Sequence, residues 1–185
     1  MNNPVRILGI AGSLRQHSYN RGALRAATEL TPEGATIEIF ELDGLPAFNQ
    51  DEDQNPPLKV VDLKKRIREA DAILFVTPEY NYSIPGVLKN AIDWASRPYG
   101  DSAWNGKPAA IMGASVGGIA TARAQYHLRQ IFVFLNMHPL NFPEIMVPFA
   151  SQNFDAAGNL TNDKTREMIK QQLEALVAWS RKLNG

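Results

Sequence analysis

The sequence predicts an α/β fold in which a parallel sheet carries helices on both faces. Strand-like and helix-like segments alternate along the whole chain, as in parallel sheets. Several strand-like segments are nearly continuous apolar runs, which is typical of strands buried on both faces. The 185 residues suit one domain. We therefore expect a single domain over residues 1–185, with right-handed crossovers between its strands.

The first half of the chain opens with a strand. Residues 5–11 form an apolar run, and the Ala- and Leu-rich residues 21–30 after it predict a helix. Residues 36–42 alternate, with Ile37 and Ile39 on one side, which predicts a second strand. Pro, Gly, Asn and Asp residues make 43–57 a loop.

The rest of the chain continues the alternation. Apolar runs predict buried strands, and apolar residues on one face predict helices. Prolines at positions 139 and 143 indicate that the last strand lies at an edge of the sheet. The predicted helices are 58–70, 86–96, 117–135 and 165–183, and the predicted strands are 71–77, 108–114 and 138–147. Ligands of such sheets bind at the carboxyl ends of the strands, so the loops after those ends matter most.

Composition excludes several functions. The chain has no cysteine, which excludes disulfides, thiol catalysis and cysteine-bound metals. Nineteen basic and nineteen acidic residues balance, so nothing indicates nucleic acid or an anionic membrane as a partner. Apolar runs are far shorter than the ~20 residues of a spanning helix, and the first residues lack a signal-peptide pattern. We expect a cytoplasmic protein without integral membrane contact.

The loop after the first strand predicts a phosphate site. Gly12 allows a tight turn, while Ser13, Ser18 and Asn20 bring hydroxyl and amide groups to a helix N-terminus, which favours anions. Arg15 adds a guanidinium suited to phosphate oxygens. The loop matches neither a Walker loop nor a dinucleotide fingerprint. The alternative is ordinary helix capping by Ser18 or Asn20.

The loop at residues 77–86 follows the third buried strand. Two prolines and the pair Tyr80 and Tyr82 make it stiff, so its backbone could present fixed groups to a planar heterocycle. The alternative is a rigid connector whose tyrosines merely pack. Trp94, on the next helix, fits the core or a subunit interface better than a ligand contact.

Residues 113–118 follow the fourth strand. The neighbouring Gly117 and Gly118 let backbone approach a ligand closely. Taken alone, the pair is explained slightly better by a simple strand-to-helix turn. The three histidines, at positions 17, 127 and 138, are too scattered to indicate a metal site, and we expect none.

Two long motifs together resemble a known family. They are Gly12-Ser13-Leu14-Arg15 with Ser18 and Asn20, and Pro78-Glu79-Tyr80-Asn81 with Ser83, Pro85-Gly86, Leu88-Lys89-Asn90-Ala91 and Asp93-Trp94. The chain is similar over nearly its whole length to the NADPH-dependent FMN reductase family, and within it to the bacterial quinone and chromate reductase branch.

The resemblance implies a flavodoxin-like, doubly wound five-stranded sheet of order 2-1-3-4-5, bound FMN, and a homodimer or homotetramer. It also assigns cofactor contacts by position. The FMN phosphate loop would comprise Ser13, Leu14, Arg15, Ser18, Tyr19 and Asn20. Pro78, Glu79, Tyr80, Asn81 and Ser83 would line the isoalloxazine edge, largely through backbone groups, and Ser115, Gly117 and Gly118 would border the ring or the ribityl chain.

The implied function is an NAD(P)H oxidoreductase that passes two electrons through FMN to a quinone, with free flavin, chromate and azo compounds as further candidate acceptors. No side chain is required as a catalytic residue, because the flavin N5 carries the hydride. No nicotinamide domain is recognisable, so donor and acceptor should use one flavin face in turn. Two alternatives stay open: a flavodoxin-type electron carrier, which the zero net charge disfavours, and a flavin-binding regulatory module.

The helix predicted at residues 117–135 is apolar beyond a single stripe. Phe132 and Leu135 share its inward face, whereas Val133 and Phe134 lie on another side. A second apolar surface needs a cover, which supports at least a homodimer.

Overall fold

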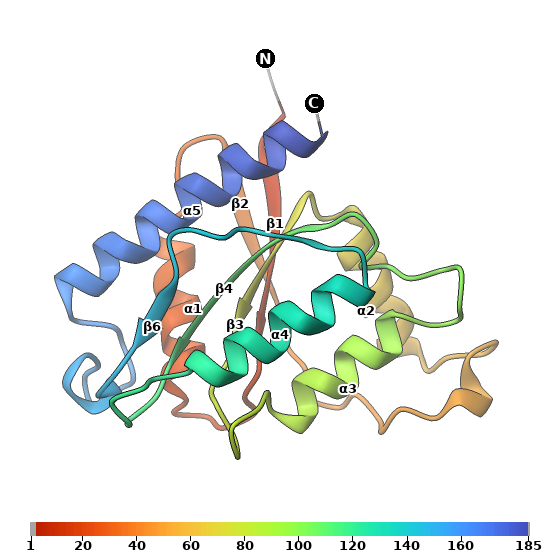
Figure 1. Ribbon diagram of the computed structural model, residues 1–185, viewed down its shortest axis with the longest axis horizontal. Helices are drawn as coiled ribbons and strands as arrows, with labels where there is room; N and C mark the ends of the chain where they lie inside the picture. Colours follow the sequence, from red (N-terminus) through yellow and green to blue (C-terminus); the bar gives the residue numbers. More distant parts are fainter. Residues whose placement is uncertain (1–2, 185) are drawn as a thin grey trace.

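The computed structural model describes residues 3–184 and places a parallel sheet at the centre of the molecule (Figure 1). The strand order is β2-β1-β3-β4-β5, and β6 pairs with β4, so the predicted order 2-1-3-4-5 is confirmed. Every pairing is parallel. The strands are β1 (Val5–Ala11), β2 (Ala35–Phe40), β3 (Ala72–Val76), β4 (Pro108–Ala114), β5 (His138–Pro139) and β6 (Ile145–Val147).

Helices cover both faces of this sheet. They are α1 (Tyr19–Glu29), α2 (Leu58–Glu69), α3 (Gly86–Ala95), α4 (Ala122–Phe134) and α5 (Asp163–Asn184). Short 3₁₀ turns at Gln50–Glu52 and Ala150–Gln152 interrupt two of the connections. Figure 1 shows α3 and α4 lying together in front of the sheet, with the long α5 across its upper edge.

The core is divided into two layers by the alternation of side chains along each strand. From β3, Ile73 and Phe75 pack with α2, α3 and α4, whereas Leu74 and Val76 face α1 and α5. Every residue of β3 and β4 is buried. The apolar runs in the sequence therefore mark strands covered on both sides. Trp94 is buried as well, and its indole N–H donates to the Pro46 carbonyl at 2.9 Å.

Two predicted elements were wrong in extent. The helix predicted from residue 117 begins only at Ala122, because Ala120 has a φ of 53° and Thr121 is not helical. The predicted edge strand 138–147 is divided into β5 and β6, both paired with β4. Pro143 lies between them and has no N–H to donate to a strand partner. Within residues 3–184, the sheet therefore contains six strands, whereas the sequence predicted five.

Within residues 3–184, none of the helices is long and apolar enough to cross a bilayer.

Candidate functional site

Three loops meet at the carboxyl edge of the sheet, where β1, β3 and β4 end. They appear along the lower edge of the molecule in Figure 1. The Gly12 N–H donates to the Val76 carbonyl at 2.9 Å, and the Thr77 N–H donates to the Met112 carbonyl at 3.0 Å. These bonds continue the sheet past the ends of its strands. They hold the loop openings next to one another.

Gly113, near the end of β4, allows this close approach. A side chain there would clash with the Thr77 carbonyl and the Thr121 hydroxyl. The glycine that weakens the strand pattern in the sequence is thus required by packing beside the site.

The first loop ends at a helix N-terminus that no side chain caps. Ser18 occupies the N-cap position of α1, and its hydroxyl makes no capping bond. The first N–H groups of a helix have no partner within the helix, so those of α1 are available to an anion. Ser13 and Ser18 are buried, and the Ser13 hydroxyl accepts from the Arg15 N–H at 3.3 Å. Ordinary capping by Ser18 is therefore not what the structure shows.

Arg15 is the cation of this loop. Its guanidinium carbon lies 5.5 Å from the centre of the Tyr19 ring, and no carboxylate within residues 3–184 pairs with it. An exposed guanidinium without an acidic partner, beside free helix N–H groups, suits a phosphate group.

Asn20 links the first loop to the third. Its side-chain amide donates to the Ala114 carbonyl at 2.9 Å, and its oxygen accepts from the Ala114 N–H at 2.9 Å. The residue is buried, and it fixes the start of α1 against the end of β4. Asn20 thus positions the loop, and its oxygen is already engaged by the protein.

The second loop contains a tight turn. Tyr80 and Ser83 exchange two backbone hydrogen bonds of 3.0 Å. The two residues between them, Asn81 and Tyr82, have φ values of 51° and 65°, as in a type I′ turn. Asn tolerates this conformation, whereas a tyrosine there is unusual and strained. Tyr80 and Tyr82 are 50% and 66% exposed, so neither is part of the hydrophobic core.

Glu79 connects this turn to α4. Its carboxylate is 9% exposed and accepts from the backbone N–H groups of Arg123 at 2.9 Å and of Ala124 at 3.1 Å. It also pairs with the Arg123 guanidinium at 3.0 Å. The same guanidinium carbon lies 3.9 Å from the centre of the Tyr82 ring. Glu79 therefore caps α4, and Arg123 holds the strained turn in place.

Ser83 is likewise engaged by α4. Its hydroxyl is hydrogen-bonded to Nδ1 of His127 at 3.0 Å. His127 is exposed, and no group of three or more potential metal ligands occurs within the described residues 3–184.

The third loop is hydrogen-bonded to the end of β6 and to the segment after it. The Ser115 N–H donates to the Val147 carbonyl, and the Ser115 carbonyl accepts from the Ala150 N–H, both at 3.0 Å. A side chain at Gly118 would lie 3.2 Å from the ring of Phe149, which has a φ of 47°. Gly117 and Gly118 therefore present exposed backbone beside an aromatic ring.

Comparison with known proteins identifies the arrangement. The sequence model for NADPH-dependent FMN reductases matches residues 5–152. The chain belongs to the NADPH-dependent FMN reductase family. It is 55% identical, over the full length of both chains, to an NAD(P)H-dependent FMN reductase of Pseudomonas aeruginosa. It is 42% identical to a 2-hydroxy-1,4-benzoquinone reductase of a Burkholderia species, covering 96% of this chain and 97% of that one.

A solved structure agrees with this assignment. The flavoenzyme FerB of Paracoccus denitrificans, an NAD(P)H:(acceptor) oxidoreductase, superposes with a TM-score of 0.88 at 36% identity. The match covers 96% of this chain and 98% of that one. The fold is therefore the flavodoxin-like α/β fold, and this family member is an oxidoreductase.

The site has the features that FMN requires. The uncapped α1 and Arg15 would suit a phosphate, and exposed apolar side chains of the neighbouring loops would suit a large planar ring. These side chains come from the three loops and the segment after β6, and they are Leu14, Tyr80, Tyr82, Val116, Ile119 and Phe149.

Sequence reasoning missed two residues at this edge of the sheet. Arg123 stands 41 or more positions from the motifs that it contacts, and an arginine on a predicted helix gives no signal of such contacts. Phe149 was placed in no motif, because its left-handed backbone cannot be recognised from a phenylalanine in the sequence.

Proposed function

We propose that this chain, as one domain over residues 1–185, is an FMN-dependent NAD(P)H oxidoreductase that reduces quinones by two-electron transfer. One observation carries the proposal: at the carboxyl edge of a flavodoxin-like sheet, the uncapped N-terminus of α1 lies near exposed aromatic side chains and an arginine that no carboxylate among residues 3–184 pairs with. The quinone as acceptor is supported by the relative named as a 2-hydroxy-1,4-benzoquinone reductase.

The phosphate of FMN would bind at the first loop. Ser13, Ser18 and the free N–H groups at the start of α1 donate to its oxygens, and Arg15 neutralises its charge. Leu14 and Tyr19 flank this position, and Asn20 holds the loop against β4.

The isoalloxazine would lie over the second and third loops. Pro78, Glu79, Tyr80 and Asn81 offer backbone groups to its edge, since the Glu79 carboxylate is engaged by α4. Ser83 lies in the same turn, and Ser115, Gly117 and Gly118 border the ring or the ribityl chain from the other side. When bound, the flavin supplies the site of hydride acceptance and release.

Donor and acceptor would use the same face of the bound flavin in turn. The three loops account for the phosphate, the ribityl chain and the ring edge, and no second nucleotide-binding unit is recognisable in the sequence. The oxidised nicotinamide, NADP⁺ or NAD⁺, would therefore leave before the quinone binds. Reacting atoms must approach to about 3–3.5 Å, so both substrates cannot occupy that face together.

An acceptor panel tests the proposal. The gel-filtered protein is supplied with NADPH or NADH and with a benzoquinone, free FMN, chromate, an azo dye or ferricyanide, and kcat/KM is compared. The proposal expects turnover with the quinone and a yellow protein whose released chromophore has the mass of FMN. Release of FAD, or nicotinamide oxidation that no acceptor stimulates, would contradict it.

We propose that the protein functions in the cytoplasm as a homodimer or homotetramer. Val133 and Phe134, which the sequence assigns to a second apolar side of α4, are 81% and 76% exposed. Tyr126 and Phe142 are exposed as well. Large apolar side chains that are this exposed in a single chain are usually covered by another protein surface.

A further inference from the structure

A second cavity lies beside the third loop, between the end of β6 and the start of α5. Its volume is about 350 Å³, within the range of small-molecule sites. Met146, Phe149 and Gln152 line it from β6 and the segment after β6, and Lys164 and Met168 line it from α5. Figure 1 shows this part of the chain at the lower left, next to the loop that follows β4. None of these residues belongs to the surface for which a subunit contact is proposed.

The ring of Phe149 separates this cavity from the site proposed for FMN. Phe149 lines the cavity and is 50% exposed, and a side chain at Gly118 would lie 3.2 Å from its ring. Its φ of 47° is unusual for a phenylalanine, and backbone of this kind is found mainly at functional sites. The hydrogen bonds of Ser115 with Val147 and Ala150 hold the backbone on either side of it. The cavity therefore adjoins the proposed flavin site across one aromatic ring.

Side-chain hydrogen bonds hold the wall of the cavity in place. The Asn153 amide donates to the carbonyls of Pro148 at 3.0 Å and of Phe149 at 3.2 Å. The Asn162 side chain accepts from the Thr165 N–H at 2.9 Å and thereby caps the first turn of α5. The wall is therefore fixed before any ligand binds, which lowers the entropic cost of binding.

The side chains around the cavity combine apolar surface with one available cation. Lys164 is exposed, and no carboxylate within residues 3–184 pairs with its ammonium. Gln152 is exposed as well, and its amide can both donate and accept. Phe149 and Met168 supply an aromatic ring and a polarisable thioether, which suit the faces of a flat heterocycle. The cavity therefore suits a heterocycle that carries an anionic group.

We propose that this cavity binds the adenosine 2′-phosphate end of NADPH, an inference that rests on the proposed function. The nicotinamide must reach the flavin ring, and the pyrophosphate bridge then carries the adenosine to a neighbouring surface. The adenine would lie between Phe149 and Met168, and the Lys164 ammonium would pair with the 2′-phosphate. NADH lacks this phosphate, so Lys164 would make NADPH the preferred donor.

Calorimetric titration of the FMN-loaded protein with adenosine 2′,5′-bisphosphate tests the site without turnover. FMN fills the phosphate loop in this form, so the probe cannot bind there. Lys164→Gln should weaken binding about 3- to 10-fold, less than the loss of a buried charged contact, because solvent screens the exposed ammonium. Lys164→Glu should weaken it further, since it places a like charge beside the phosphate.

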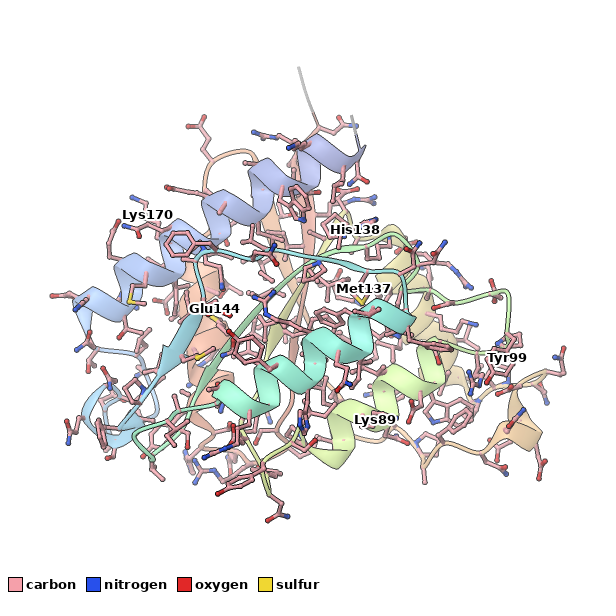
Figure 2. The ribbon with its side chains drawn as sticks, viewed as in Figure 1. Lys89, Tyr99, Met137, His138, Glu144 and Lys170 are labelled. Atoms are coloured by element: carbon pink, nitrogen blue, oxygen red, sulfur yellow. The ribbon has the colours of Figure 1, made fainter. Side chains whose placement is uncertain are left out.

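Two controls accompany the titration. Lys170→Gln makes the same change at another exposed position of α5, which is labelled in Figure 2, and should bind the bisphosphate as the unchanged protein does. Adenosine 5′-monophosphate, which lacks the 2′-phosphate, should bind the unchanged protein more weakly than the bisphosphate. Its affinity should be the same for Lys164→Gln as for the unchanged protein.

Steady-state rates with both donors give a second readout. Lys164→Gln should lower kcat/KM for NADPH about 3- to 10-fold and leave kcat/KM for NADH unchanged. An equal fall with both donors would overturn this inference and leave the proposed function intact. So would bisphosphate binding that neither Lys164 variant weakens, or no binding at millimolar bisphosphate. If the unchanged protein oxidises neither donor, the proposed function fails, and the titration alone decides whether the cavity takes the nucleotide.

Discussion

Replacement of Glu79 by alanine should destabilise the protein at the junction of the second loop and α4. The substitution removes two hydrogen bonds to the backbone N–H groups of Arg123 and Ala124. Loss of a helix cap costs about 0.5–2 kcal/mol, and a second unpaired N–H adds about 1 kcal/mol. The Arg123 guanidinium is 36% exposed, so solvent screens its pairing with Glu79 and that pairing adds little. We expect a total loss of about 1.5–3 kcal/mol.

Equilibrium unfolding in urea, with FMN removed, measures this loss. The corresponding fall in the thermal midpoint is about 3–12 °C for a chain of this size. Glu79→Gln is the informative comparison, because its amide oxygen can still accept from the helix N–H groups, and it should lose about 1 kcal/mol. Glu174→Ala, on the exposed side of α5, is the control and should change stability by less than about 0.5 kcal/mol.

The same substitution should weaken FMN binding, because Glu79 ties the ring-edge loop to α4. Fluorescence quenching of FMN gives the dissociation constant. If Glu79→Ala unfolds within about 0.5 kcal/mol of the unchanged protein, the carboxylate does not cap α4 and the reasoning fails.

Four further outcomes are expected. Asn20→Ala should lower the free energy of unfolding in urea by about 2–3 kcal/mol, because it leaves a buried backbone N–H and carbonyl of β4 unpaired. A loss no larger than that of a surface substitution would refute this prediction. Arg15→Ala should raise the Kd for FMN about 10- to 150-fold, and an unchanged Kd would show that backbone groups alone hold the phosphate. The ammonium of Lys64 donates to Asp101 and holds the pKa of that carboxyl below its usual 3.8. The pairing of Lys64 with Asp101 therefore stabilises the folded protein above about pH 4. This stability is lost as pH falls through the lower pKa that Asp101 has in the folded state. The deficit of Asp101→Asn should accordingly be largest at neutral pH and shrink in acid, whereas a deficit independent of pH would contradict the pairing. Val133→Glu should lower the mass measured by light scattering, and a monomeric unchanged protein would remove the case for a dimer.

The parts of the fold set by burial could be predicted from sequence. The apolar residues of β1, β3 and β4 reveal strands covered on both faces, and the loops after them follow directly. The sheet order came from the family resemblance, because strand order depends on long-range packing that local patterns do not record. The start of α4 was misjudged, since the left-handed backbone of Ala120 has no signature in an alanine.

Within the candidate site, the structure gives two of the predicted residues side-chain contacts that the sequence did not predict. Glu79 was expected to contribute backbone groups at the ring edge, and its carboxylate proved to cap a helix 43 or more residues away in sequence. Asn20 was assigned to the phosphate, and its side chain proved to bond β4. Such roles depend on which segments the fold brings together, so they can be recognised only from the three-dimensional structure.

Two-substrate kinetics test the central claim most directly, that one flavin held by this chain serves nicotinamide and quinone in turn. Initial rates are measured with the gel-filtered protein while NADPH is varied at several fixed concentrations of a benzoquinone. We predict parallel lines in the double-reciprocal plot, because the first product leaves before the second substrate binds. Intersecting lines would show both substrates bound at once and would contradict the account.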